Sequence, residues 1–274
     1  LFREPDTLEA DGFKLKGNRW IKGKQIFVPL YEAKMCRPYD HRHGSIYVKA
    51  GNWYMQGKTN LSTHVEHQNP EHLAFPRYWA SQEEIEQRLP EWDRPFLFAF
   101  RDIVRPTDER TLISHFVPRV GAINTMPLLL TPATAARLCS LMGNFNSFAL
   151  DFVARQKISQ VHMNFFILEQ LPVLPPDTYA KRCPWDRRTT LETWISERVL
   201  KLTCTAEDML PLAEACGFTG GSFRAEYGGR LNKWDEAERA DRYEYVITTT
   251  RYDFDKTSYP EAEIVHRIMR GDAL

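Results

Sequence analysis

The clearest alternation of apolar and polar positions lies between residues 144 and 176. Five apolar side chains there recur at spacings of three and four residues, the spacing of one helix face: Phe145, Phe148, Ala149, Phe152 and Val153. Residues 163–168 are nearly continuous apolar surface, typical of a strand covered on both faces. Pro172, Pro175 and Pro176 cannot continue a central strand. The pattern therefore predicts a helix and a strand that form a packed core without obvious chemistry.

Upstream of this stretch, short apolar runs bounded by turn residues indicate strands. They cover 25–35 with a break at Pro29, 44–49, 96–104, 111–117 and 121–130. A capping box that begins at Ser81 predicts a short helix ending at Pro90, and Thr131 with Pro132 predicts the start of another. Residues 50–75 show little periodicity, which favours an exposed loop.

After residue 176 the pattern becomes helical. Helices are predicted over 190–202 and 206–215, then over 230–242 and from about 261, with a strand over 243–249. We therefore expect an α+β fold with a mixed β-sheet core and packed helices. Residues 1–176 would form a β-rich domain and residues 177–274 a mainly helical C-terminal region.

Composition adds limits to this picture. The chain has 274 residues, 43% of them hydrophobic, which suffices for a core, and no run reaches the roughly 18 apolar residues of a membrane span. Its five cysteines are irregularly spaced without a C-x-x-C pair, so we expect a reducing, cytoplasmic location and no membrane partner. The first residues contain neither an initiator Met nor a leader, so we expect a piece of a longer protein.

Charge is informative through its distribution. The 36 basic and 36 acidic residues cancel, so the total gives no reason to expect a polyanion partner. Four arginines nevertheless lie between 101 and 119, and Arg37, His41, Arg42 and His43 crowd one short segment. Acidic residues accompany the arginines after 101. Two interpretations stay open: an internal salt-bridge lattice, or arginines presented to an anionic partner such as phosphate or guanine.

Catalytic motifs are scarce. Glu32 and Lys34 fit the E-x-K half of a Mg²⁺-dependent nuclease, although a solvated strand edge explains the same residues. The histidines at 41, 43, 64, 67 and 72 lack the spacing of a zinc site. The nucleotide-binding glycine loops and the G-x-S-x-G elbow are absent from the sequence. We therefore predict no catalytic residue and no metal ligand.

Three segments resemble a known family. They are Phe27-Val-Pro-Leu-Tyr-Glu-Ala-Lys-Met35 with Tyr39-Asp-His-Arg42, then Phe100-Arg-Asp-Ile-Val-Arg-Pro-Thr-Asp-Glu-Arg-Thr-Leu-Ile113, and Asn146-Ser-Phe with Asn164-Phe-Phe-Ile-Leu-Glu-Gln-Leu-Pro172. Their order resembles the C-terminal target recognition region of large bacterial adenine-specific DNA methyltransferases, found in type II restriction-modification and phage-defence systems. The resemblance covers about 25–215 and implies a TaqI-like recognition domain. Ala33 stands where the family has Gly, and the match fades beyond 217.

The resemblance also implies partners. The Asn-Pro-Pro-Tyr catalytic motif and the glycine-containing S-adenosylmethionine motif of the family are absent here. The chain would therefore bind no cofactor itself, and the parent enzyme would use S-adenosylmethionine. The expected partners are double-stranded DNA and the catalytic methyltransferase domain of the same parent chain.

The loops 37–43 and 101–124 are the expected DNA-contacting segments. The predicted contact residues are Arg42, Arg101, Arg105 and Arg110, with His43 and Asn124 behind them. Arginine pairs with guanine and asparagine with adenine through two hydrogen bonds each. The alternatives are the nuclease on Glu32 and Lys34, or a module that docks proteins through a Phe-rich surface. His162 and Asn164 are either satisfied core groups or a part of the scaffold that touches DNA.

Overall fold

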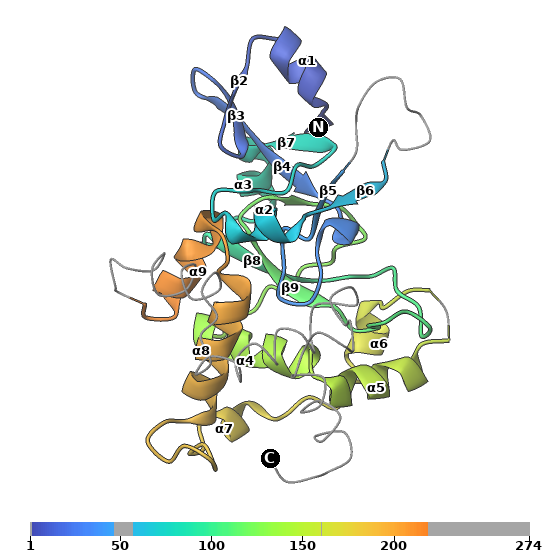
Figure 1. Cartoon of the computed structure of the whole chain (residues 1–274), viewed down its shortest axis with the longest axis vertical. Helices are drawn as coiled ribbons and strands as arrows, with labels where there is room; N and C mark the ends of the chain where they lie inside the picture. The colour runs from blue at the N-terminus through green and yellow to red at the C-terminus, as the bar shows by residue number, and fades with distance from the viewer. Residues whose placement is uncertain (1, 47–56, 160, 219–274) are drawn as a thin grey trace.

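The computed structural model describes residues 2–46, 57–159 and 161–218, and within them the fold is α+β with mainly antiparallel strands (Figure 1). The helices and the strand predicted after residue 229, and the end of the strand predicted over 44–49, lie outside these residues.

The largest sheet lies at the top of Figure 1, near α1 (Pro5–Ala10). Its strands run in the order β1 (Phe2–Arg3), β7 (Tyr78–Ser81), β4 (Gln25–Tyr31), β3 (Arg19–Lys22) and β2 (Lys14–Lys16), and β10 (Gly121–Ala122) joins β4 in parallel. The predicted break at Pro29 is wrong, since Pro29 pairs with Trp79 inside β4. On the other edge of β4, pairing with β3 ends at Phe27 and pairing with β10 begins at Leu30. A residue without an amide is tolerated because its second neighbour is missing there.

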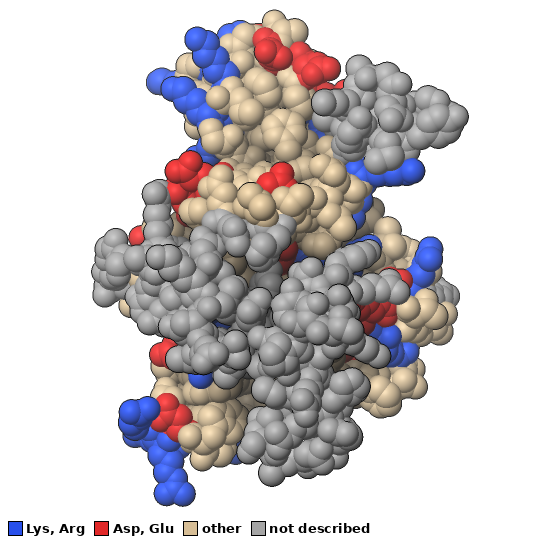
Figure 2. Space-filling model, in the orientation of Figure 1, with Lys and Arg blue, Asp and Glu red and all other residues tan. Residues whose placement is uncertain are grey.

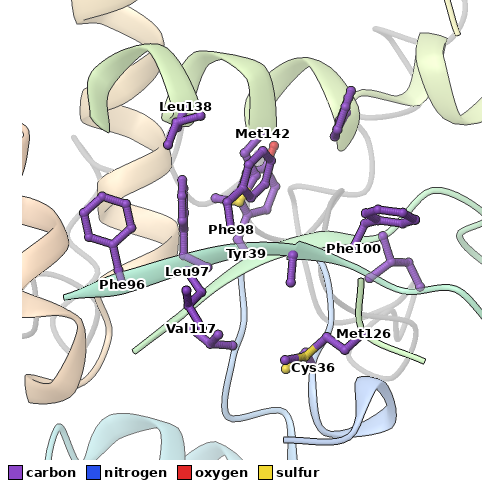
Figure 3. Packing of buried hydrophobic residues seen from close by; sticks show 14 of the residues in the cluster. Cys36, Tyr39, Phe96, Leu97, Phe98, Phe100, Val117, Met126, Leu138 and Met142 are labelled. Atoms are coloured by element: carbon purple, nitrogen blue, oxygen red, sulfur yellow. The ribbon is translucent and has the colours of Figure 1, made fainter. Parts of the chain in front are cut away.

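The main core is built on the antiparallel pair of β8 (Phe96–Phe100) and β9 (Ser114–Pro118). All five residues of β8 are buried. Figure 3 shows Leu138 and Met142 of α4 (Ala135–Phe145) over one side of this pair, and Cys36 and Met126 on the other side. Burial on both faces explains why the strand sequence is an uninterrupted apolar run.

The remaining elements between residues 33 and 88 are short. They are η1 (Ala33–Met35), β5 (Gly44–Ile46), β6 (Thr59–Leu61), α2 (His64–Gln68) and α3 (Gln82–Arg88). β5 pairs with β6, and α2 follows β6 directly. The helix predicted from Ser81 is confirmed as α3, whereas β8 and β9 are shorter than predicted and leave residues 101–113 as a loop.

The C-terminal helices belong to the same core. They are α7 (Pro176–Tyr179), α8 (Leu191–Thr203), η2 (Glu207–Met209) and α9 (Leu210–Ala215). α8 packs closely on α4, since a Cβ added to Gly143 would lie 2.9 Å from a methyl carbon of Ile195. One apolar cluster runs from Tyr31 to Ala213, so the core does not divide at residue 176.

The stretch 144–157 is helical, but the predicted core face is wrong. α4 ends at Phe145, and α5 (Phe148–Lys157) starts anew with Ser147 as its N-cap. Phe145 is buried, whereas Phe148 is 52% exposed and Phe152 is 65% exposed. The buried face of α5 consists of Leu150, Asp151 and Ala154. The break between the helices changes the direction in which the later phenylalanines point.

The strand predicted over 163–168 is also wrong. Asn164 caps a short helix there, α6 (Phe165–Leu168), by accepting the amide of Ile167 at 3.0 Å. Leu168 is buried while Phe166 is 74% exposed. A polar cap and a short apolar run favour a helical turn as readily as a strand, which is why periodicity alone misassigned it.

Asp151 explains why α5 turns a carboxylate inward. Its Oδ1 accepts the amides of Thr111 and Leu112 at 2.7 and 2.8 Å, and its Oδ2 accepts Arg155 Nε at 2.9 Å. Arg155 in turn donates to the carbonyls of Pro106 and Glu109. The loop 101–113 is thereby fixed to α5.

We predict that Asp151→Ala lowers the free energy of unfolding by about 3–4 kcal/mol, because two buried amides and Arg155 lose their acceptor and the buried Arg110 loses its ion-pair partner. Phe152→Ser, one residue away, should change it by less than about 0.5 kcal/mol because the ring is exposed. Urea denaturation of both variants measures this. A loss of about 3 kcal/mol in Phe152→Ser would instead show that Phe152 is a core residue.

Candidate nucleic-acid interface

The two loops predicted to contact DNA meet in the structure. The amide of Tyr39, in the loop 37–43, donates to the carbonyl of Ser114 in β9 at 3.3 Å. Tyr39 has a φ of 65°, and within the described residues it is the non-glycine residue with a positive φ. Its side chain is buried in the core. Left-handed backbone of this kind costs about 1–3 kcal/mol and persists where the surroundings hold it, often at functional sites.

Three basic side chains gather where the loops meet, and we call Arg37, His43 and Arg101 the cationic cluster. Arg37 Nε lies 3.3 Å from His43 Nε2, and Arg101 Nε donates to the carbonyl of Ile103 at 2.8 Å. Burial lowers the pKa of Arg101, and the nearby charge of Arg37 lowers it further. The two guanidinium groups are thus close enough to repel each other.

The two arginines of the cationic cluster have no ion-pair partner in the described part of the chain, whereas His43 Nδ1 lies 3.9 Å from Asp40 Oδ2. Neither arginine has a carboxylate oxygen within 4.0 Å there, in contrast to the arginines at 3, 77, 110, 119, 137, 155 and 188. Burial and then the charge of Arg37 outweigh Asp40 and lower the pKa of His43 to about 4. His43 is therefore neutral at neutral pH, and its Nε2 can accept the proton of Arg37 Nε.

Arg37 is the residue that sequence reasoning missed. It lies in the same short basic segment as Arg42, but nothing in the sequence indicates which of the two arginines is buried. The structure shows Arg37 half-buried at the cluster and Arg42 completely buried.

Arg42 is a structural residue, which corrects its prediction as a DNA contact. Its guanidinium donates to the carbonyls of His67, Asn69 and His72 and to that of Thr205, at 2.6 to 3.0 Å. It joins the end of α2 to the chain after α8. A fully buried and hydrogen-bonded guanidinium is not available to a DNA molecule.

Arg110 is likewise buried, which corrects a second predicted contact. Its guanidinium donates to the carbonyl of Asn146, and its carbon Cζ lies 4.7 Å from the ring centroid of Phe148. Arg110 Nε lies 3.6 Å from Asp151 Oδ1. Burial lowers the pKa of Arg110, and Asp151 opposes that effect. The lattice interpretation is correct for this arginine.

The remaining predicted contacts lie at the surface. Arg105 and Asn124 are exposed, and the neighbour of Asn124, Thr125, accepts the amide of Asp102. Asp102 pairs with His162 at 2.8 Å rather than with Arg101. Asp108 accepts the amide of Arg105 at 3.0 Å and closes a turn. Arg105 and Asn124 thus lie on the loop segments that carry the cationic cluster.

His162 and Asn164 are surface residues, not core groups. The side chain of His162 is about half exposed beside Asp102, and Asn164 is exposed at the cap of α6. His162 therefore extends the polar surface that begins at Arg101, while Asn164 has a local role in starting a helix.

A partly buried ion pair between Asp40 and His67 holds the loop 37–43 in place. Asp40 accepts the amide of Arg42 at 3.0 Å and faces His67 Nε2 at 3.1 Å, while His67 Nδ1 faces the carbonyl of Thr63 at 3.0 Å. A carboxylate and a carbonyl both only accept, so His67 satisfies both as an imidazolium. Burial opposes that charge, but Asp40 outweighs it and the pKa of His67 is raised. Burial likewise opposes the charge of Asp40, and His67 nevertheless holds the pKa of Asp40 well below its usual range.

The nuclease alternative gains little from the geometry. Glu32 and Lys34 form an ion pair of 2.9 Å with each other, and Lys34 also donates to the carbonyl of Gly57. His41 is buried against Asp208 at 2.9 Å. Within the described ranges, no three His, Cys, Asp or Glu side chains gather to hold a metal ion.

Comparison with known protein families, with curated proteins and with solved structures gives no significant match. Helices in the described residues are too short or too polar to cross a membrane. Figure 2 shows that basic and acidic side chains are interspersed on the visible face.

We predict a pH-dependent contribution from His67. Because its pKa is raised in the folded state, the contribution is complete below the ordinary value near 6.5 and is lost as the pH rises through the folded value. The difference in unfolding free energy between the wild type and His67→Gln should therefore be larger by about 1 kcal/mol at about pH 6 than at about pH 9.

Urea denaturation at several pH values measures this difference. A buried histidine whose lowered pKa does not depend on His67, such as His115, affects both proteins alike and cancels. A difference that stays constant across this pH range would show that His67 is a neutral imidazole in the folded protein.

Proposed function

We propose that the chain is the DNA sequence-recognition module of an S-adenosylmethionine-dependent adenine-specific DNA methyltransferase from a restriction-modification system. The observation that carries the proposal is the cationic cluster of Arg37, His43 and Arg101, held where the loops 37–43 and 101–124 meet. Arg37 and Arg101 repel each other and neither forms an ion pair with a carboxylate of the described residues, although Asp108 acts on Arg101 from farther away, so an anion is favoured at that place.

The cluster suits a polyanion in two ways. Planar guanidinium groups form paired hydrogen bonds with phosphate oxygens or with the guanine edge. Arg101 is partly desolvated, as its lowered pKa shows, so its attraction to an incoming phosphate is less screened by water. The neutral His43 adds a hydrogen-bonding group that costs little to desolvate.

The rim of the cluster supplies groups for base contacts. Arg105 is exposed on the loop 101–113, which begins with Arg101, and Asn124 is exposed just after β10. Their backbone is fixed, because Asp108 closes the turn at Arg105 and the carbonyl of Thr125 accepts the amide of Asp102. A fixed backbone keeps recognition groups in register with base edges.

The balanced total charge is compatible with this role when a second domain contributes to binding. Phosphate contacts supply most non-specific affinity. In the proposed arrangement the catalytic methyltransferase domain provides part of these contacts and binds S-adenosylmethionine, while the chain described above selects the sequence.

We predict that Arg37→Gln and Arg101→Gln each weaken binding of the whole chain to a mixed-sequence duplex by about tenfold, and lower the slope of log affinity against log salt by about 1. Fluorescence anisotropy at several salt concentrations measures both quantities. Arg19→Gln, an exposed change of equal charge on β3, is the matched control and should leave both unchanged. Equal affinity of all four proteins would remove the cluster from the interface.

A second candidate function, docking of a protein domain, is favoured by the outward rings of α5 and α6. Phe148, Phe152, Phe165 and Phe166 are all exposed, and Figure 1 shows α5 and α6 as neighbouring helices at the lower right. Large exposed apolar patches often mark an interaction site. We propose that the occupant is the catalytic methyltransferase domain, since a recognition module has to be held in a fixed orientation to it.

In the parent enzyme, the amides of α5 should exchange with solvent deuterons more slowly than in the isolated chain, because a docked domain suppresses local opening. The amides of α3, a surface helix on the large sheet, serve as the internal control and should exchange equally in both. The double substitution Phe152→Ser with Phe166→Ser should abolish the protection of α5. Identical exchange of α5 in the two proteins would exclude this docking surface.

A further inference from the structure

Two cysteines far apart in the sequence lie in contact. Cys139 is buried in α4, and Cys216 is the partly exposed C-cap of α9. Their sulfur atoms are 3.8 Å apart, and both thiols are reduced. We propose that Cys139 and Cys216 form a reversible disulfide with a small-molecule disulfide, of the glutathione disulfide class, as the oxidant.

The geometry requires a small movement. A disulfide has a sulfur–sulfur distance of about 2.05 Å, so the two atoms must approach from their present 3.8 Å. Cys216 can supply this movement because it is the C-cap of α9 and follows the last helical residue. Gly217 follows with a φ of 92°, and a Cβ added there would meet no atom of the described residues within 4 Å.

The reaction order follows from exposure. Cys216 is partly exposed, so its thiolate attacks one sulfur of the oxidant, forms a mixed disulfide and releases one small thiol. Cys139 then loses its proton and attacks the sulfur of Cys216, which releases the second small thiol. Two protein thiols are oxidised and one small disulfide is reduced. Burial and then the hydrogen-bonded thiol of Cys216 raise the pKa of Cys139, so Cys139 is the poorer first nucleophile and reacts only after Cys216 holds the mixed disulfide beside it.

A third cysteine, Cys204, is an alternative disulfide partner for Cys139. Cys204 is buried and lies near enough for its charge to affect Cys139. Its Sγ, however, donates to the carbonyl of Met209 at 3.5 Å, whereas Cys139 and Cys216 contact each other directly. We therefore assign the disulfide to Cys139 and Cys216 and leave Cys204 as a free thiol.

Oxidation would change the stability of the whole core. The bond would close a loop that contains α5 to α8 and would fix α9 to α4. Cross-linking residues so far apart in the chain mainly restricts the unfolded state. The oxidised protein should unfold at a higher temperature, by roughly 5–10 °C, and reduction should reverse the shift.

The test uses the whole chain, incubated with glutathione disulfide near pH 8 and then alkylated, digested without reduction and analysed by mass spectrometry. A glutamate-specific protease is needed with trypsin, because Cys204 and Cys216 share one tryptic peptide and Glu207 and Glu214 separate them. The expected product is a cross-linked peptide pair that contains Cys139 and Cys216, with three of the five cysteines still alkylated.

Matched variants decide the assignment. Cys216→Ser should abolish both the cross-link and the thermal shift, whereas Cys204→Ser should retain both. A cross-link through Cys204, or a stable glutathione adduct on Cys216 with Cys139 still alkylated, would overturn the proposal.

Discussion

The buried guanidinium of Arg42 is the constraint on which the rest of the site depends. Removing an arginine from water costs several kcal/mol unless its donors are satisfied, and here backbone carbonyls after α2 and after α8 accept them. The same residue lies next to Asp40 and His67, whose ion pair fixes the loop from the other side. The loop 37–43 therefore has one stable position, and Arg37 and His43 take theirs from it.

A second buried charge, Asp151, does the same for the loop 101–113. It turns α5 so that a carboxylate faces inward and the phenylalanines face outward. Because Phe148 and Phe152 face outward, burial of their rings does not stabilise the fold. We therefore expect another surface to cover them in the assembled protein. Satisfied amides at Thr111 and Leu112 offset part of that cost, because an unpaired buried amide would cost about 1–3 kcal/mol.

The sequence correctly predicted the elements that depend mainly on residues close to them in the chain. The buried strand β8 and the helices α3 and α8 follow from an apolar run, a capping box and helical spacing, and each lies close to where it was expected. The face of α5 could not be predicted, because it depends on a helix break at Asn146 and on partners of Asp151 some 40 residues away. The run 163–168 is too short for periodicity to separate a strand from a helical turn.

In the candidate site, too, some features could be predicted from the sequence and others depend on the fold. Sequence reasoning found the two loops, and the structure brings them together at Tyr39 and Ser114. It could not rank the arginines, since Arg37 and Arg42 differ only in what the fold places around them. Arg42 meets the carbonyl of Thr205, 163 residues away, and Arg110 meets Asn146. Burial of a cation is decided by such distant acceptors, and no local pattern encodes them.

The loop 101–113 runs from the cationic cluster to the exposed phenylalanines of α5. Arg101 lies at its start, in the cationic cluster, and Arg110 lies near its end, beneath the ring of Phe148. Between them the loop is held by the Asp108 turn and by Arg155. A domain docked on the phenylalanines would therefore contact the same segment that carries Arg101, the arginine proposed to bind DNA. Such a connection would fix the orientation of the recognition loops relative to the docked domain without any change in their own conformation.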